Sequence, residues 1–164
     1  VTFLPYLTGG YGKETDASGA FLNMTLDTDR GTLWRAVLEA IGYDYIGVTD
    51  EYRAAGVDLS RITIAEGGST DDVWNQIKSD MIGSDAVVMK TRGGAILTDC
   101  AMAAYAAGDH DDLVGRLSDA AQVDRFFSPD AGNTRLYRSL YDSRRSIMEG
   151  MLPVFSTLKG MSGQ

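Results

Sequence analysis

One segment of the sequence places a strand, a glycine pair and a helix start in succession: Ile62-Thr63-Ile64-Ala65-Glu66-Gly67-Gly68-Ser69-Thr70-Asp71-Asp72. Glycines after a strand let another group approach the backbone, because no side chain blocks it. The helix start beyond them offers free N–H groups and a positive partial charge. The segment therefore predicts a shelf for a nucleotide, although it matches neither a Walker loop nor a complete G-x-G-x-x-G fingerprint. By composition alone, a tight turn without a ligand explains it at least as well.

Strands and helices are predicted to alternate on both sides of this segment. The expected strands are Val1–Leu7, a short one through Phe21, Met24 and Leu26, Arg61–Ala65, and one within Asp85–Thr91. The first expected helix runs from a cap at Thr28 or Asp29 to about Ala55, and the second starts at Ser69 or Thr70. Further helices are expected over Ala95–Ala107, near Asp111–Ala121 and over Asn133–Leu158. Pro153 should bend or break the last of these. A loop is expected through Pro129. This alternation predicts an α/β sheet layered by helices, in one domain.

Apolar residues at helical spacing predict which helix faces are buried. They are Leu33, Val37, Ile41, Tyr45 and Val48 in the first helix, Val73, Trp74, Ile77 and Met81 in the second, and Leu136, Leu140, Ile147, Met151 and Phe155 in the last. The helix Ala95–Ala107 is rich enough in alanine to pack closely on a sheet. Trp34 and Trp74 are both expected to be packing residues.

Composition and charge exclude several classes of protein. With 44% hydrophobic and 23% charged residues among 164, the chain is neither disordered nor collagen-like. A compact fold of this mass would expose about 8,000 Å². The net charge of −8 argues against a nucleic-acid backbone or an anionic membrane as a partner. There is no apolar run of the length that a membrane span needs and no secretory leader, so the cytoplasm is the expected compartment.

Isolated reactive side chains give weaker signals. His110, the sole histidine, is interpreted as a solvated residue near a helix start, because a catalytic triad would need partners that the sequence does not show. Cys100, the sole cysteine, is interpreted as a small buried thiol among alanines. Arg144 and Arg145 are expected to form a solvated face rather than an anion site. The carboxylates at the second helix start are expected to complement its dipole.

Further motifs follow one another along almost the whole chain. They are Leu4-Pro5-Tyr6-Leu7-x-Gly9, Asp16-Ala17-Ser18-Gly19, residues 35–43 (RAVLEAIGY), Gly67-Gly68, Trp74-x-Gln76-x-x-x-Asp80, residues 101–108 (AMAAYAAG), and Tyr137 and Tyr141 ahead of Leu152-Pro153. In this order they resemble the C-terminal domain of the FGGY carbohydrate kinases, most of all the xylulokinase branch. The sequence departs from the family pattern at Gly10, Tyr11, Glu66 and Asp99, which puts the sugar, the adenine contacts and full activity in question.

The resemblance implies an actin-like, ribonuclease-H-like α/β domain with a mixed sheet flanked by helices. Residues 1–164 would be part of the C-terminal domain of a two-domain kinase, with the N-terminal domain and the start of this domain absent. ATP would lie between the domains, with Gly67, Gly68, Ser69 and, less directly, Asp72 at its adenosine. Mg²⁺ would be held by ATP and the other domain, which would also supply the catalytic base. No catalytic residue or metal ligand is therefore expected in this chain.

The function implied by the resemblance is ATP-dependent phosphorylation of xylulose or a related ketopentose or polyol. The expected partners are this substrate, ATP and the N-terminal kinase domain, and a homodimer is compatible with the resemblance. The chain alone is expected to be inactive. Two alternatives remain open: a non-catalytic actin-like module that binds nucleotide, and a plain α/β interaction domain whose glycine pair binds nothing.

Overall fold

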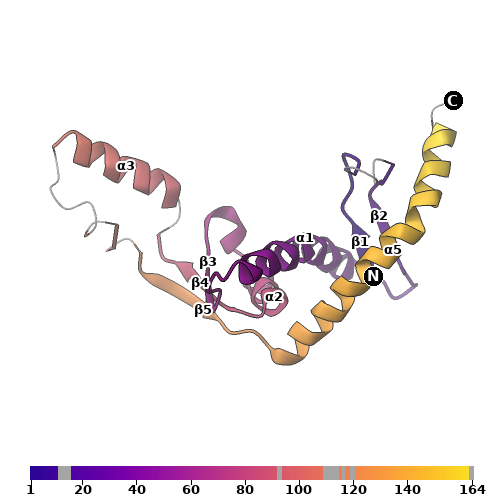
Figure 1. Cartoon of the computed structure of the whole chain (residues 1–164), viewed down its shortest axis with the longest axis horizontal. Coiled ribbons are helices and arrows are strands. Elements are labelled where there is room, and N and C mark those ends of the chain that lie inside the picture. The colour runs from indigo at the N-terminus through magenta and orange to yellow at the C-terminus, as the bar shows by residue number, and fades with distance from the viewer. Residues whose placement is uncertain (11–15, 92–93, 109–114, 116, 119–120, 163–164) are drawn as a thin grey trace.

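The computed structural model describes residues 1–10, 16–91, 94–108, 115, 117–118 and 121–162. Figure 1 shows their arrangement, with the chain ends on the same side of the molecule. The elements are β1 (Thr2–Leu4), β2 (Ala20–Leu22), α1 (Arg30–Ala54), β3 (Arg61–Ile64), the 3₁₀ turn η2 (Glu66–Ser69), α2 (Asp72–Ile82), β4 (Asp85–Met89), α3 (Gly94–Ala106), β5 (Val123–Phe127) and α5 (Ala131–Ser162). The expected α/β class is confirmed. The helix predicted near Asp111–Ala121 and the residue His110 fall largely or wholly outside the described residues.

Residues 62–72, the segment with the glycine pair and here called the glycine segment, begin in a mixed sheet of order β3-β4-β5. β3 pairs in parallel with β4, with Ile62 opposite Ala86, and the chain crosses between them through η2 and α2. β5 pairs antiparallel with β4, with Phe126 opposite Val87. The loop predicted through Pro129 is therefore wrong over these five residues. The sequence of this strand, VDRFF, contains two adjacent charged residues, so sequence analysis does not detect it. Its pairing with β4 determines that it forms a strand.

The long helix α1 begins where the sequence predicts, because Asp29 caps it: its Oδ1 accepts the Thr32 N–H at 2.7 Å. The predicted buried face is wrong at Ile41, Tyr45 and Val48, whereas Leu33 and Val37 are partly buried. Ile41, Tyr45 and Val48 are 42%, 39% and 48% exposed. The buried face is instead made by Ala36, Leu38, Ala40, Gly42, Tyr43, Ile46 and Thr49. On this face α1 approaches α2 closely at Gly42, where a Cβ would collide with the sulfur of Met81.

Buried apolar side chains in the described part of the chain gather in separate clusters. α1, α2 and α5 share one cluster, made of Leu38, Tyr43, Ile46, Trp74, Ile77, Met81 and Tyr137. β1 and the C-terminal half of α5 share another, made of Leu4, Ala17, Met148 and Phe155. The sheet carries a third, made of Ile64, Ala86 and Val88. Trp74 therefore packs as predicted. The side chains expected to be buried but found exposed are Trp34, Val73, Leu136, Leu140 and Ile147. Met24 and Leu26, expected in the second strand, lie beyond the end of β2 and are exposed too.

The helix α3 lies apart from the sheet, as Figure 1 shows. Among its residues, all of which the structure describes, Ala101 alone is buried. The expected close packing on the sheet is therefore wrong, and so is the expected burial of Cys100, whose side chain is exposed. Asp99 is exposed on the same helix, so its carboxylate meets no packing conflict here.

The terminal helix α5 runs without a break from Ala131 to Ser162 and contains Pro153. Of the two expected effects of this proline, a bend or a break, the break does not occur. In Figure 1 the C-terminal part of the helix departs from the direction of its first part, consistent with the expected bend. No helix within the described ranges has both the length and the apolar character required to cross a membrane.

Candidate functional site

The glycine segment forms a compact turn between β3 and α2. β3 ends at Ile64, and residues 66–69 then make the single 3₁₀ turn η2, here called the glycine turn. α2 begins at Asp72 because Asp71 caps it: its Oδ1 accepts the Trp74 N–H at 2.8 Å. Strand, turn and helix thus follow in the predicted order. The helix begins two or three residues later than expected because the glycine turn uses Ser69.

The exposed glycines Gly67 and Gly68 are not explained by the packing of this chain. Neither has a left-handed backbone, which the structure assigns to Gly9, Gly56, Gly83 and Gly108. A Cβ at Gly67 would meet no described atom within 4 Å, and one at Gly68 would meet only Lys78 Nζ, at 3.8 Å. Both positions have room for a side chain, so the absence of one leaves the backbone accessible to an external group.

Four side chains bind the carbonyl groups of the glycine turn, and one of them is local, since Thr70 Oγ1 donates to Gly67 O at 3.1 Å. Lys78 Nζ donates to Gly68 O at 2.5 Å. Asn75 Nδ2 donates to Ser69 O at 2.9 Å, and Arg125 Nη2 donates to the same oxygen at 2.9 Å. Asn75 and Lys78 come from α2, whereas Arg125 comes from β5. Two elements far apart in the sequence therefore determine the shape of this turn.

Lys78 is a buried cation beside the turn, with only 5% of its surface exposed. Its ammonium lies 4.9 Å from the centre of the Trp74 ring and donates to Asn75 Oδ1 at 3.2 Å. Burial lowers the pKa of Lys78 from 10.5 to about 8, and the charge of Asp71 opposes this shift only in part. A lysine at such a place loses its proton just above neutral pH.

A hollow of about 290 Å³ lies beside the glycine turn. Residues 62–65 line it, together with Tyr45, Gly68, Lys78 and Ile82. Tyr45 comes from the α1 face that the sequence predicted to be buried, and its ring edges this hollow instead. Apolar walls with a backbone edge and a few polar groups, here from Tyr45, Thr63 and Lys78, are typical of sites for flat organic ligands.

The structure gives the four predicted site residues different surroundings. Gly67 and Gly68 are exposed on the turn. Ser69 is only 2% exposed, so its side chain lies inside the protein. Asp72 forms an ion pair with Arg125. The four residues lie together at one turn and helix start, but Ser69 can affect a ligand only through the shape of its backbone.

Sequence analysis missed Asn75, Lys78 and Arg125. Lys78 carried a usable signal, because it lies four residues after Trp74 on the apolar stripe of α2, where a charge is unexpected. Asn75 lies next to that stripe and is fully buried. Arg125 carried no signal, because its position depends on the pairing of β5 with β4.

The spaced motif of Trp74, Gln76 and Asp80 connects α2 to the start of α5. Asp80 is 3% exposed and accepts from Gln76 Nε2 at 2.8 Å, from the Asp130 N–H at 2.8 Å and from Asn133 Nδ2 at 2.9 Å. Because these partners belong to the protein itself, this motif has a structural role here.

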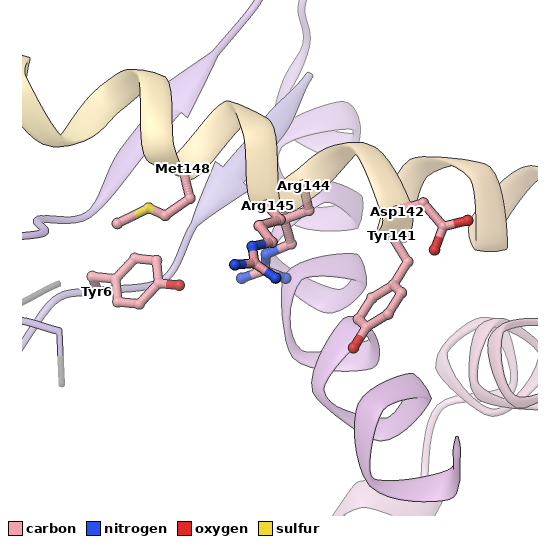
Figure 2. Close-up of a pocket in the computed structure, with 6 residues that line it drawn as sticks. All are labelled: Tyr6, Tyr141, Asp142, Arg144, Arg145 and Met148. Atoms are coloured by element: carbon pink, nitrogen blue, oxygen red, sulfur yellow. The ribbon is translucent and has the colours of Figure 1, made fainter. Parts of the chain in front are cut away.

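A second hollow, of about 400 Å³, lies beside α5. Figure 2 shows the guanidinium groups of Arg144 and Arg145 between Tyr6 and Tyr141. Arg144 donates to Ala40 O at 3.0 Å and stacks on a tyrosine of α1, while Arg145 pairs with the glutamate one turn later. Arg145 is exposed, as expected for a solvated face, whereas Arg144 is partly buried by these contacts. In the described ranges, acidic, histidine and cysteine side chains form no group suited to a metal ion.

The sequence profile described as "FGGY family of carbohydrate kinases, C-terminal domain" matches residues 1–107. The chain therefore belongs to this family, as part of its C-terminal domain. The xylulose kinase of Escherichia coli (strain K12) is 28% identical over 160 residues, which are 95% of this chain and 33% of that protein. Glycerol kinases and a gluconokinase are also among its relatives.

Solved structures share the fold. The xylulose kinase from Rhodospirillum rubrum superposes with a TM-score of 0.71 at 27% identity, covering 94% of this chain and 31% of that one. A Plasmodium falciparum glycerol kinase with ADP superposes with a TM-score of 0.74 at 22% identity, covering 90% of this chain and 30% of that one. The chain spans about a third of the length of the relatives that it matches.

Proposed function

We propose that this chain is the nucleotide-binding part of an ATP-dependent sugar kinase, and that the adenosine of ATP rests on Gly67 and Gly68. The observation that carries the proposal is the open glycine turn, where the packing of this chain leaves both Cβ positions free. A nucleoside needs such a backbone surface, because a side chain there would displace its flat base. Membership of a kinase family is consistent with this assignment.

The residues present fit a nucleoside better than a phosphate chain. The hollow beside Gly68 has apolar walls from β3 and an aromatic edge from Tyr45, which suit an adenine or a ribose. Asp72, already paired with Arg125, borders the same turn. ATP with its Mg²⁺ would supply the phosphoryl group, and transfer would depend on positioning and charge neutralisation. We place the general base and the metal contacts in the N-terminal domain of the same protein.

The substrate that we propose is xylulose or a related ketopentose or polyol. Xylulose kinases among the matched proteins and structures support this choice. Glycerol kinases and a gluconokinase among the same relatives make a wider panel of substrates necessary in any test.

The decisive experiment is a phosphorylation assay of the full-length protein with ATP and Mg²⁺ over a panel of pentoses, hexoses and polyols. We expect ADP release that depends on a ketopentose or a related polyol and is matched by sugar phosphate. Nucleotide binding without transfer to any panel member would instead support a non-catalytic actin-like module. Absence of nucleotide binding would refute the proposed site altogether.

A further inference from the structure

The ammonium of Lys78 is connected to both carbonyl groups that define the C-terminal half of the glycine turn. It donates directly to Gly68 O at 2.5 Å. It also donates to Asn75 Oδ1 at 3.2 Å, while the amide nitrogen of Asn75 donates to Ser69 O at 2.9 Å. One cation therefore orients two successive peptide groups of the proposed nucleotide surface.

We propose that Lys78 is a positioning residue for nucleotide binding, and that its protonated form keeps the glycine turn in the shape that accepts adenosine. The proposal rests on the nucleotide site proposed above. Lys78 need not touch the nucleotide, since it acts through the Gly68 carbonyl and through Asn75. A charged donor makes stronger hydrogen bonds than a neutral amine, so loss of the proton weakens both connections.

The surroundings of Lys78 make this control operate near neutral pH. Burial lowers the pKa of its side chain to about 8. Among the described titratable groups, Asp71 at the start of α2 favours the charged form. Tyr45 from α1 lines the same hollow, and Arg125 from β5 binds Ser69 O and Asp72 on the other side of the turn. With this pKa, Lys78 changes from mostly charged to mostly neutral between pH 7 and pH 9.

The expected effect is a loss of nucleoside affinity as pH rises. If only the protonated lysine supports binding, with its pKa at about 8, affinity falls about tenfold between pH 7 and pH 9. Adenosine is the suitable probe, because neither its base nor its ribose titrates in this range. ATP would be less suitable, because its phosphates bring charges of their own.

The test measures the adenosine dissociation constant of the full-length protein at several pH values from 7 to 9, together with its melting temperature. Wild type should lose about tenfold in affinity over this range. Lys78→Met should bind severalfold more weakly at pH 7 and show no further loss. Lys78→Arg should recover most of the affinity and show no loss with pH, since a guanidinium stays charged. The matched control is Lys159→Met. Lys159 lies on α5 and pairs with Asp16, and this variant should follow wild type.

Two results would overturn this inference while leaving the proposed function intact. One is a wild-type affinity for adenosine that is constant from pH 7 to pH 9. The other is a folded Lys78→Met variant that binds as tightly as wild type at pH 7. If neither adenosine nor ATP binds to wild type at any pH, the proposed nucleotide site itself is refuted.

Discussion

Glycines occupy positions in this chain for different physical reasons. Gly83 ends α2 with a left-handed backbone (φ +70°), a conformation that other residues adopt only with strain. Gly42 lies where α1 meets α2, and a Cβ there would collide with the sulfur of Met81. Gly67 meets neither condition. A substitution at Gly67 therefore tests a ligand contact, whereas one at Gly42 tests packing.

The first prediction uses this contrast. In the full-length protein, Gly67→Val should weaken ATP binding by tenfold or more, about 1.4 kcal/mol, because its side chain would occupy the adenosine surface. The melting temperature should stay close to that of wild type, since the added atoms meet open space. Affinity for the sugar should change far less, because we expect the sugar contacts to come mainly from the N-terminal domain. Calorimetric titration with each ligand measures these effects.

Gly42→Ala is the matched control for that experiment. It should lower the melting temperature, because Met81 must move to make room. Its effect on the affinity for ATP should be small in whatever fraction remains folded. Unchanged ATP affinity in a well-folded Gly67→Val variant would remove Gly67 from the site.

The second prediction concerns the stability contribution of Lys78. Its pKa is about 8 when folded and 10.5 ordinarily, so between these values the unfolded chain binds a proton that the folded chain does not. Stability from this group must therefore rise as pH increases from 8 to about 10. The melting temperature of wild type minus that of Lys78→Met should increase over that interval. A flat difference would mean that the lysine is solvated.

At the scale of elements, α2 connects the glycine turn to the rest of the protein. Asn75 and Lys78 bind the turn at one end of this helix. Gln76 and Asp80 bind the residues that precede and begin α5. The helix α2 is therefore hydrogen-bonded both to the glycine turn and to the start of α5.

The third prediction tests the connection between α2 and α5. Asp80→Ala should destabilise the protein by about 2 kcal/mol, because it removes a buried carboxylate that accepts three partly buried hydrogen bonds, from Gln76, Asp130 and Asn133. Urea unfolding measures this change. Asp44→Ala, an exposed carboxylate on α1, should stay within about 0.5 kcal/mol of wild type. Equal effects of the two substitutions would contradict a structural role for Asp80.

At the scale of the whole molecule, the chain is more open than its mass predicts. It exposes 10602 Å², against about 8,000 Å² for a compact protein of 17.7 kDa. In the described part of the chain the buried residues form separate clusters, and α3 lies apart from the sheet in Figure 1. Several large apolar side chains on α1 and α3 are exposed as well.

The fourth prediction follows from the proposed division of labour between domains. Residues 1–164 alone should phosphorylate no sugar, because the general base is proposed to lie in the N-terminal domain. The full-length protein, purified in the same way, serves as the positive control in the same assay. Sugar phosphate formed by the rigorously purified chain alone would require a general base within these residues.

Local patterns in the sequence were sufficient for most element positions. The cap at Asp29, the strand Arg61–Ile64 and the alanine-rich helix α3 all depend on interactions within a few residues, so they could be predicted. The strand β5 could not, because its ladder with β4 joins residues almost forty positions apart. The buried face of α1 was also missed, because close approach at Gly42 decided it.

The sequence by itself determined the α/β class, the family and the place of the glycine pair between a strand and a helix. These follow from local propensities and from the order of motifs along the chain, which can be read without knowing the fold. Only the tertiary structure showed that Gly67 is open, that Ser69 is buried, and that Lys78, Asn75 and Arg125 bind the carbonyls of the turn. The physical reason is that burial and hydrogen bonding depend on which distant elements meet, and neighbouring residues in the sequence do not encode that directly.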